Sequence, residues 1–217
     1  MMGEGMGRDE RVVRLVPFLP EFLAMDLKII FAGVSAILGV LCFLPYLRDI
    51  FGNTTKPHSY TWFVWSVLQI IVAAAMWKGG AGWAIASSVI GAVFCMLIFL
   101  LSLKYGTKNI TVFDRICLAG SLLALVAYLV FQDPLLSVVL VTLTDMLGFL
   151  PTLRKAYREP GTETASTHLI SSVSCAFALL ALGRFTLTTA LYLSVIMVLD
   201  AICGFTVLAR SKPANLL

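Results

Sequence analysis

Seven apolar stretches constrain the fold of this chain more than any other feature. Each is close to the roughly 20 residues that a helix needs to cross the hydrocarbon core of a bilayer. They cover residues 27–50, 60–77, 83–103, 113–131, 135–157, 165–182 and 188–209, with short breaker-rich segments between them. A helix pairs its own backbone polar groups inside lipid, whereas an open strand edge does not. The sequence therefore predicts an all-α membrane protein with seven transmembrane helices.

The composition supports this class and argues against a nucleic-acid-binding protein. Of the 217 residues, 59% are hydrophobic and only 13% are charged, whereas about a quarter of the residues of a soluble domain are charged. The net charge of +4 is small and spread along the chain. We expect the lipid bilayer as a partner and no nucleic acid. The sequence leaves open whether the protein forms a homo-oligomer.

The cysteines and the short motifs point to neither a redox nor a catalytic site. The five cysteines lie in apolar stretches and show no CxxC spacing, which favours packing residues over a disulfide framework or a zinc site. The chain contains no HExxH, GxSxG or P-loop motif, and these are the short signatures of common enzymes. We expect no enzyme activity, no metal and no cofactor.

One hexad, Phe-Leu-Pro-x-Leu-Arg, occurs twice, at residues 43–48 and 149–154, with its prolines 106 residues apart. The same offset aligns the Ser-Val-Ile triplet at 88–90 with that at 194–196. We interpret the pattern as an internal duplication. The first three stretches then correspond to the last three. Because three spans are an odd number, the fourth restores the orientation, and the prediction is a 3+1+3 parallel repeat.

The predicted organisation has five parts. Pro17 and Pro20 interrupt the charged N-terminal region, which is too short and too broken to span. The parts are a surface-lying or disordered lead-in (1–25), a first three-helix repeat (26–106), a linker helix (107–133), a second three-helix repeat (134–210) and a C-terminal tail (211–217).

The basic residues predict the orientation. Ten lysines and arginines lie in or beside the connections after the first, third and fifth spans and after the last, whereas the opposite side has only Lys78 and Arg184 in its connections, together with Lys28 and the N-terminal tail. Cytoplasmic segments are enriched in Lys and Arg. We expect a multi-pass protein of the plasma (inner) membrane, with its N-terminus outside and its C-terminus in the cytoplasm.

Both repeats contain a proline near the cytosolic end of the first span, a basic loop, and hydroxyl residues at the start of the next span. Leu-Pro-Tyr (44–46) through Ser-Tyr-Thr-Trp (59–62), and Leu-Pro-Thr (150–152) through Ser-Thr-His (166–168), resemble the PQ-loop superfamily. That superfamily includes the SWEET and SemiSWEET (MtN3-like) sugar transporters and lysosomal amino-acid exporters. The eponymous Pro-Gln is Pro-Tyr and Pro-Thr here. The resemblance covers about residues 27–210 and implies a carrier with the 3+1+3 fold.

Asp145 and Asp200 are the costliest residues in the apolar stretches, since a charge at the bilayer centre costs about 2.5–3.5 kcal/mol on insertion scales. Their spans run in the same direction, which places both at a similar depth. One interpretation is that they carry a proton, together with His168. The alternative is a neutral carboxyl hydrogen-bonded to nearby threonines or to backbone.

The other candidates recur in both repeats or flank recurring residues. We interpret Pro45 and Pro151 as hinges, the alternative being static kinks, and Trp62, the repeat partner of His168, as part of a gate. The resemblance implies a solute-binding side chain at the positions of Ser88 and Ser194. We group these serines with Tyr192 and Gln69 as substrate-binding candidates, although serine is also common at helix contacts.

The leading functional hypothesis is a carrier for a small polar solute, with a sugar-like solute favoured, working by alternating access between two three-helix bundles. Asp145 and Asp200 support an alternative, a proton-coupled exporter of the amino-acid type. A non-transporting membrane receptor or scaffold is the third hypothesis.

Overall fold

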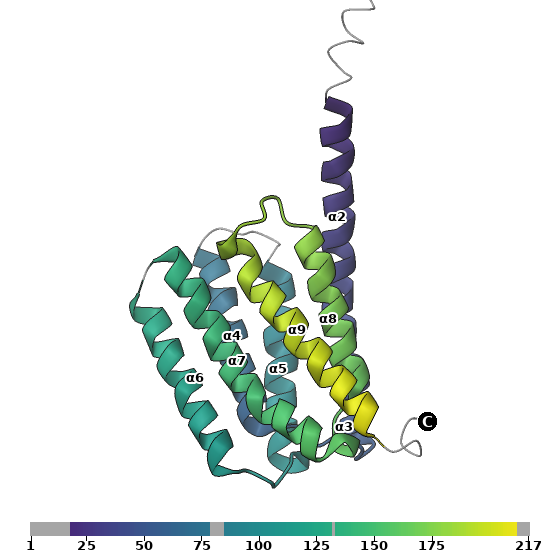
Figure 1. Cartoon of the computed structure of the whole chain (residues 1–217), viewed down its shortest axis with the longest axis vertical. Helices are drawn as coiled ribbons and strands as arrows, with labels where there is room; N and C mark the ends of the chain where they lie inside the picture. The colour runs from purple at the N-terminus through teal and green to yellow at the C-terminus, as the bar shows by residue number, and fades with distance from the viewer. Residues whose placement is uncertain (1–17, 79–84, 132, 212–217) are drawn as a thin grey trace, which may run out of the picture.

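The computed structural model describes residues 18–78, 85–131 and 133–211, which are helical apart from short connections (Figure 1). The elements in these ranges are α2 (Phe18–Leu41), α3 (Phe43–Phe51), α4 (Ser59–Lys78), α5 (Ile85–Tyr105), α6 (Val112–Val130), α7 (Pro134–Arg158), the 3₁₀ turn η2 (Pro160–Thr162), α8 (Ala165–Leu180) and α9 (Leu187–Arg210).

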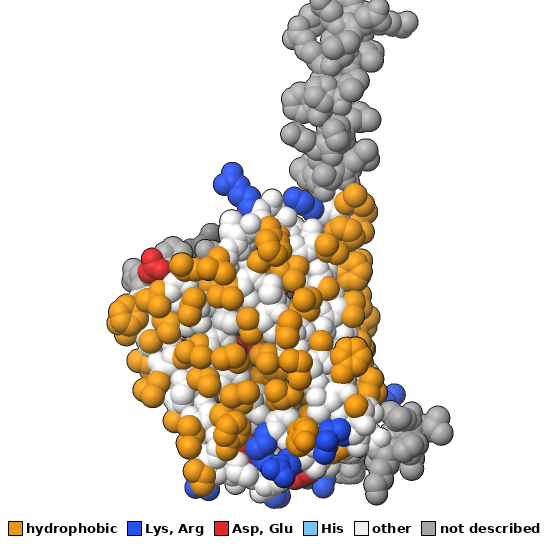
Figure 2. Space-filling view, viewed as in Figure 1, with side chains coloured by type: hydrophobic (Ala, Val, Ile, Leu, Met, Phe, Trp, Pro, Cys, Tyr) orange, Lys and Arg blue, Asp and Glu red, His pale blue; other side chains and the backbone are white. Residues whose placement is uncertain are grey.

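Within the described ranges, four helical stretches are long and apolar enough to cross a membrane: Leu27–Phe51, Val112–Val130, Leu135–Arg158 and Thr189–Arg210. Their outer faces are apolar, and on α6 the side chains of Ile116 and Leu123 are 65% and 72% exposed. Apolar side chains cover most of the face shown in Figure 2. A surface of this kind is stable in lipid rather than in water. The chain is a multi-pass integral membrane protein.

The first predicted span differs from its expected form because it is interrupted. Helix α2 ends at Leu41 and α3 begins at Phe43. Proline has no N–H to donate to the carbonyl four residues earlier, so Pro45 leaves the Leu41 carbonyl without that bond, at the point where α2 stops. Pro151, by contrast, lies inside the continuous helix α7. The two repeated prolines therefore have different local structures.

The start of the chain also differs from the expectation. Residues 1–17 of the predicted lead-in lie outside the described residues, but 18–25 already belong to α2. Pro20 is in the first turn of that helix, where a missing N–H costs nothing because the first backbone donors have no intrahelical acceptor.

The helices pack in a definite order. Helix α9 contacts both α7 and α8, α4 contacts α5 and α7, α2 packs along α8, and α6 packs on α7 and α4. Figure 1 shows α2 and α6 at opposite edges of the bundle, with α2 extending beyond the other helices at one end. Helices α3, α7 and α9 finish at the same end of the bundle (Figure 1). Their last turns contain Arg48, Arg158 and Arg210, and we call this the arginine-rich end.

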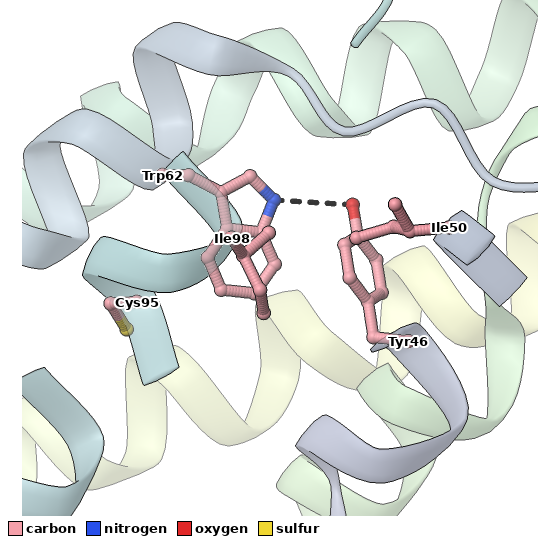
Figure 3. Close-up of a cluster of buried hydrophobic side chains, with 5 residues drawn as sticks. All are labelled: Tyr46, Ile50, Trp62, Cys95 and Ile98. Atoms are coloured by element: carbon pink, nitrogen blue, oxygen red, sulfur yellow. Dashed lines mark hydrogen bonds between the residues drawn. The ribbon is translucent and has the colours of Figure 1, made fainter. Parts of the chain in front are cut away.

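Two apolar clusters fill the bundle near the arginine-rich end. The first joins α3, α4 and α5 (Figure 3) and contains Tyr46, Ile50, Trp62, Cys95 and Ile98. The second joins α7 and α9 and contains Phe149, Ala156, Cys203 and Val207. Trp65 packs against both clusters and thereby connects the two halves of the bundle.

The approach of α4 to α7 depends on the absence of a side chain at Gly148. A Cβ atom at this position would lie 2.7 Å from Val64 Cγ1 and 3.0 Å from Val64 Cβ. Small residues at such contacts let two membrane helices come close enough for dense packing.

Gly148→Ala should lower the free energy of unfolding by about 1–3 kcal/mol, because it overpacks this contact. Denaturant unfolding in detergent micelles measures the change. Gly33→Ala is the matched control, since a Cβ there meets nothing within 4 Å. Adding Val64→Ala to Gly148→Ala should restore part of the stability. Equal effects of the two glycine substitutions would contradict the role of Gly148.

Candidate functional site

Asp145 is held where three helices meet. Its side chain is on α7, and the residue is 4% exposed. Trp65 Nε1 on α4 donates to Oδ1 at 2.6 Å, and the Tyr192 hydroxyl on α9 donates to Oδ2 at 2.8 Å. A buried carboxylate is costly unless its oxygens are hydrogen-bonded, and these two donors meet that need. Asp145 and Tyr192, selected separately from the sequence, thus belong to one polar site.

Asp200 on α9 has a different set of partners. The Ser171 hydroxyl donates to Oδ2 at 2.6 Å, and His168 Nδ1 lies 2.8 Å from Oδ1. Thr142 and Thr144 donate to neither aspartate, because their hydroxyls donate to backbone carbonyls of their own helix, α7. Asp145 and Asp200 are both buried, and among the described residues no hydrogen bond links them to a shared partner.

A line of buried ionisable groups continues from Asp200 toward the arginine-rich end. His168 Nε2 lies 3.6 Å from Glu163 Oε1, and Glu163 Oε2 lies 2.6 Å from Lys155 Nζ. The first distance is longer than a hydrogen bond, so the line has one gap. We call Lys155, Glu163, His168 and Asp200 the ionisable chain.

The charge of Glu163 is fixed by its neighbours. Burial alone would raise the pKa of this carboxyl, but the Lys155 ammonium and His168 hold the pKa at about 2. Glu163 is therefore a carboxylate at neutral pH, paired with a lysine that is itself only 1% exposed.

Lys155 also ties together the two loops that follow the repeated hexads. Its Nζ atom donates to the carbonyls of Lys56 and Thr162, both at 2.7 Å. The Lys56 N–H donates to the Thr162 carbonyl at 3.0 Å, and the hydroxyls of Thr55 and Thr164 are 2.5 Å apart. We call these five residues the loop clamp. The clamp closes the arginine-rich end of the bundle.

A second buried ion pair anchors α6 to α7. Asp114 accepts from Arg154 Nε at 2.8 Å and from Nη2 at 2.7 Å, a bidentate arrangement. Asp114 also forms the capping box of α6 with Thr111. His58 Nε2 lies 3.5 Å from the same carboxylate. Burial lowers the pKa of His58 to about 4, although Asp114 opposes this shift, so the ring is neutral at pH 7.

Aromatic rings fill the space between the two carboxylate sites. Trp62 contacts Trp65 at 4.9 Å between ring centroids, Trp65 contacts Phe149 at 5.3 Å, and Phe149 contacts His168 at 5.5 Å. Trp62 Nε1 also donates to the Tyr46 hydroxyl at 3.1 Å, as Figure 3 shows. Trp62, expected at a gate, is thus packed within this aromatic row and is 2% exposed.

The remaining candidates are less closely connected to these sites. Ser194 is partly buried on α9 and has no hydrogen-bond partner for its hydroxyl among the described residues. The Gln69 amide lies against Gly91 of α5, 2.7 Å from where a Cβ would stand. Ser88 belongs to α5, but its side chain lies outside the described residues. Their assignment to solute binding stays a prediction.

Four residues of the buried ion pairs were not selected as site candidates from the sequence: Lys155, Glu163, Asp114 and Arg154. Helical spacing was a signal for Lys155. Asp145, Gly148, Thr152 and Lys155 follow one another at intervals of three or four residues, which places them on one face of α7. Lys155 is therefore buried rather than exposed to solvent. Glu163, Asp114 and Arg154 carried no such periodic signal, because their partners come from distant segments.

No protein-family model, curated protein or solved structure matches the chain. The PQ-loop resemblance rests on the residues quoted above.

Lys155→Met should destabilise the protein by about 3–5 kcal/mol, because it leaves the Glu163 carboxylate buried without its partner. Thermal denaturation in detergent measures the loss. The double variant with Glu163→Gln should be more stable than Lys155→Met alone. Lys56→Met is the matched control, since the Lys56 side chain is exposed and only its backbone joins the clamp. A Lys155→Met variant as stable as the control would contradict the buried pair.

Acidification should destabilise the wild type through Glu163. This carboxyl has an ordinary pKa of 4.5 and a pKa of about 2 in the folded protein, so the unfolded chain takes up the proton first. The stabilisation is present above pH 4.5 and is lost as the pH falls toward 2. Thermal midpoints measured across this range should fall less steeply for Glu163→Gln than for Glu159→Gln, a matched change at a partly exposed carboxylate. Parallel pH profiles of the two variants would rule out this linkage.

Proposed function

We propose that the chain is a membrane carrier for a small polar solute, built as two three-helix bundles joined by α6 in the 3+1+3 arrangement of the PQ-loop superfamily. In this proposal α2 and α3 correspond to α7, α4 corresponds to α8, and α5 corresponds to α9. The solute would bind between the bundles, and their relative movement would expose it to each side in turn.

The observation that carries the proposal is the pattern of helix contacts. Between the proposed bundles, α2 and α3 contact α8, and α4 contacts α7. Because α2 and α3 correspond to α7 and α4 corresponds to α8, these two sets of contacts are equivalent under the proposed duplication. Within the bundles, α4 on α5 corresponds to α8 on α9, and the contacts of α2 and α3 with α5 correspond to α7 on α9. Such consistency is what a parallel duplication requires.

Burial at the 106-residue offset supports the same correspondence. Ile50 and Ala156 are both 0% exposed, and Trp62 and His168 are both 2% exposed. A shared pattern of inward positions is expected when two sequence repeats form the same packing unit.

The chemistry between the bundles suits a solute with several hydroxyls. Asp145 and Asp200 have carboxylate oxygens that accept hydrogen bonds, and a sugar supplies hydroxyl donors. The ring of Trp65, which is only partly buried, offers an apolar face on which the C–H face of a sugar can pack. A solute hydroxyl would replace Trp65 or Tyr192 as a donor to Asp145. We therefore favour a sugar-like solute.

Alternating access also requires an end of the bundle that closes and opens. The loop clamp is closed and consists of polar contacts, which water can replace when the loops separate. Pro151 and the α2–α3 interruption near Pro45 lie on the helices that lead into the two clamped loops. We propose that these segments act as hinges and that the arginine-rich end faces the cytoplasm of a plasma (inner) membrane, where basic residues are enriched.

Proton coupling with an amino-acid-like solute is the second candidate, favoured by the ionisable chain. Asp200, His168 and Glu163 follow one another in the buried interior with a single gap of 3.6 Å. Chains of carboxylates and histidines inside membranes are typical proton pathways. Asp200 would be the proton-carrying group in this version.

Uptake by the purified protein in liposomes tests the proposal, with a panel of sugars and amino acids and with or without a pH gradient. The wild type should accumulate at least one solute. Asp145→Asn should reduce its uptake about tenfold or more, because a hydrogen bond to a charged group contributes about 1.5–3 kcal/mol. If uptake is proton-coupled, Asp200→Asn should abolish its stimulation by the gradient.

Asp133→Asn is the matched control. Asp133 is exposed and caps α7 by accepting from the Leu136 N–H, and asparagine caps a helix equally well. Uptake by the Asp145 and Asp200 variants equal to that of this control would exclude the proposed site. A folded wild type that moves none of the solutes would favour a receptor or scaffold.

A further inference from the structure

A groove of about 510 Å³ lies between α6, α7 and α9, and neither Asp145 nor Asp200 lines it. Its walls are mainly apolar, with Phe113 from α6, Leu150 and Leu153 from α7 and Ile202 from α9. Arg154 and Arg158 line the same groove. The groove thus combines an apolar wall with guanidinium groups.

The groove opens on the membrane-facing surface. Phe113 and Ile202 are each 46% exposed, and α6, α7 and α9 are all long enough to span a bilayer. Leu150 is about two helical turns from Arg158 along α7, so the apolar wall runs inward from the arginines. Figure 2 shows the basic side chains gathered near this end of the bundle, beside a surface that is otherwise apolar.

Positive charge exceeds negative charge around the mouth of the groove. Arg158 is exposed, and no carboxylate lies within ion-pair distance of it among the described residues. Arg210 stacks on Tyr157 at 3.9 Å and donates to its carbonyl. Nearby acids have other partners, since Asp114 binds Arg154 and Glu159 accepts from an asparagine amide at 2.6 Å.

We propose that this groove binds one anionic phospholipid from the leaflet at the arginine-rich end. The phosphate pairs with Arg158 and with Nη1 of Arg154, because Nε and Nη2 already donate to Asp114 and to the Asn109 carbonyl. An acyl chain lies along Leu150, Leu153 and Ile202. A guanidinium fork matches the oxygens of a phosphate group, and basic pockets between transmembrane helices commonly hold anionic headgroups. A zwitterionic lipid carries a cationic group as well and gains less from this excess of positive charge.

Thermal denaturation of the detergent-purified full chain tests the proposal, with phosphatidylglycerol or phosphatidylcholine of identical acyl chains added. Phosphatidylglycerol should raise the thermal midpoint by roughly 5 °C, as expected for a ligand well above its dissociation constant, and phosphatidylcholine should raise it much less. Native mass spectrometry should show one phosphatidylglycerol retained per protein.

Two variants and one control separate the parts of the site. Arg158→Gln should remove most of the preference for phosphatidylglycerol, and Ile202→Trp should reduce lipid retention by filling the groove. Lys104→Gln, at an exposed lysine on α5 outside the groove, should behave as the wild type.

Four results would overturn the proposal. Equal stabilisation by both lipids, or a full phosphatidylglycerol preference in Arg158→Gln, would show that the arginines do not select the headgroup. The same shift with inorganic phosphate alone would identify a phosphate site rather than a lipid site. A dimer that dissociates on Ile202→Trp would show that a second copy of the chain occupies the groove. Transport is measured in none of these arms, so the result stands apart from the carrier proposal.

Discussion

The ammonium group of Lys155 connects more of this structure than any other single group. It lies inside the bundle, within 2.6 Å of the Glu163 carboxylate, and donates to carbonyls of two loops that are far apart in sequence. A buried charge of this kind is tolerated only when its partner and hydrogen bonds are all present. Lys155 keeps all of these contacts only when α7, the α3–α4 connection and the turn before α8 are correctly placed at the same time. The line of groups toward Asp200 begins at the same contact.

The outer faces of this molecule are more apolar than those of a soluble domain, and several polar side chains lie inside it beside the apolar clusters. The outer faces are apolar, whereas Thr61, Thr144, Thr152 and His168 are all buried. Between helices in lipid, close packing and hydrogen bonds provide the attraction that hydrophobic burial provides in water. The hydrogen bond between Thr61 and Thr152, at 2.9 Å, joins α4 to α7 in this way. Interior polar groups thus have structural roles. Asp145 and Asp200 stand out because, among the described residues, neither pairs with a lysine or an arginine as Glu163 and Asp114 do.

The sequence predicted the membrane class, since length and hydropathy limit an apolar stretch to few conformations. It also selected Asp145, Asp200, His168 and Tyr192, which the structure brings into two hydrogen-bonded sites, because polar groups inside apolar stretches are conspicuous. The interruption at Cys42, between α2 and α3, was not predicted. Pro45 predicts a disturbed helix, but the sequence does not determine whether that helix bends or breaks. Glu163 was missed because a carboxylate in a loop is ordinary until its tertiary partner is known.

The positive charges of Arg154 and Lys155 also matter while the chain is being inserted into the membrane. In the finished molecule, carboxylates from other segments neutralise both side chains. While the chain is being inserted, α8 and the turn before it have not yet emerged from the ribosome, and Glu163 is not there to pair with Lys155. If basic residues set the orientation, as they do in other membrane proteins, part of that signal comes from the Lys155 charge, which gains its partner only after the next segment has been made.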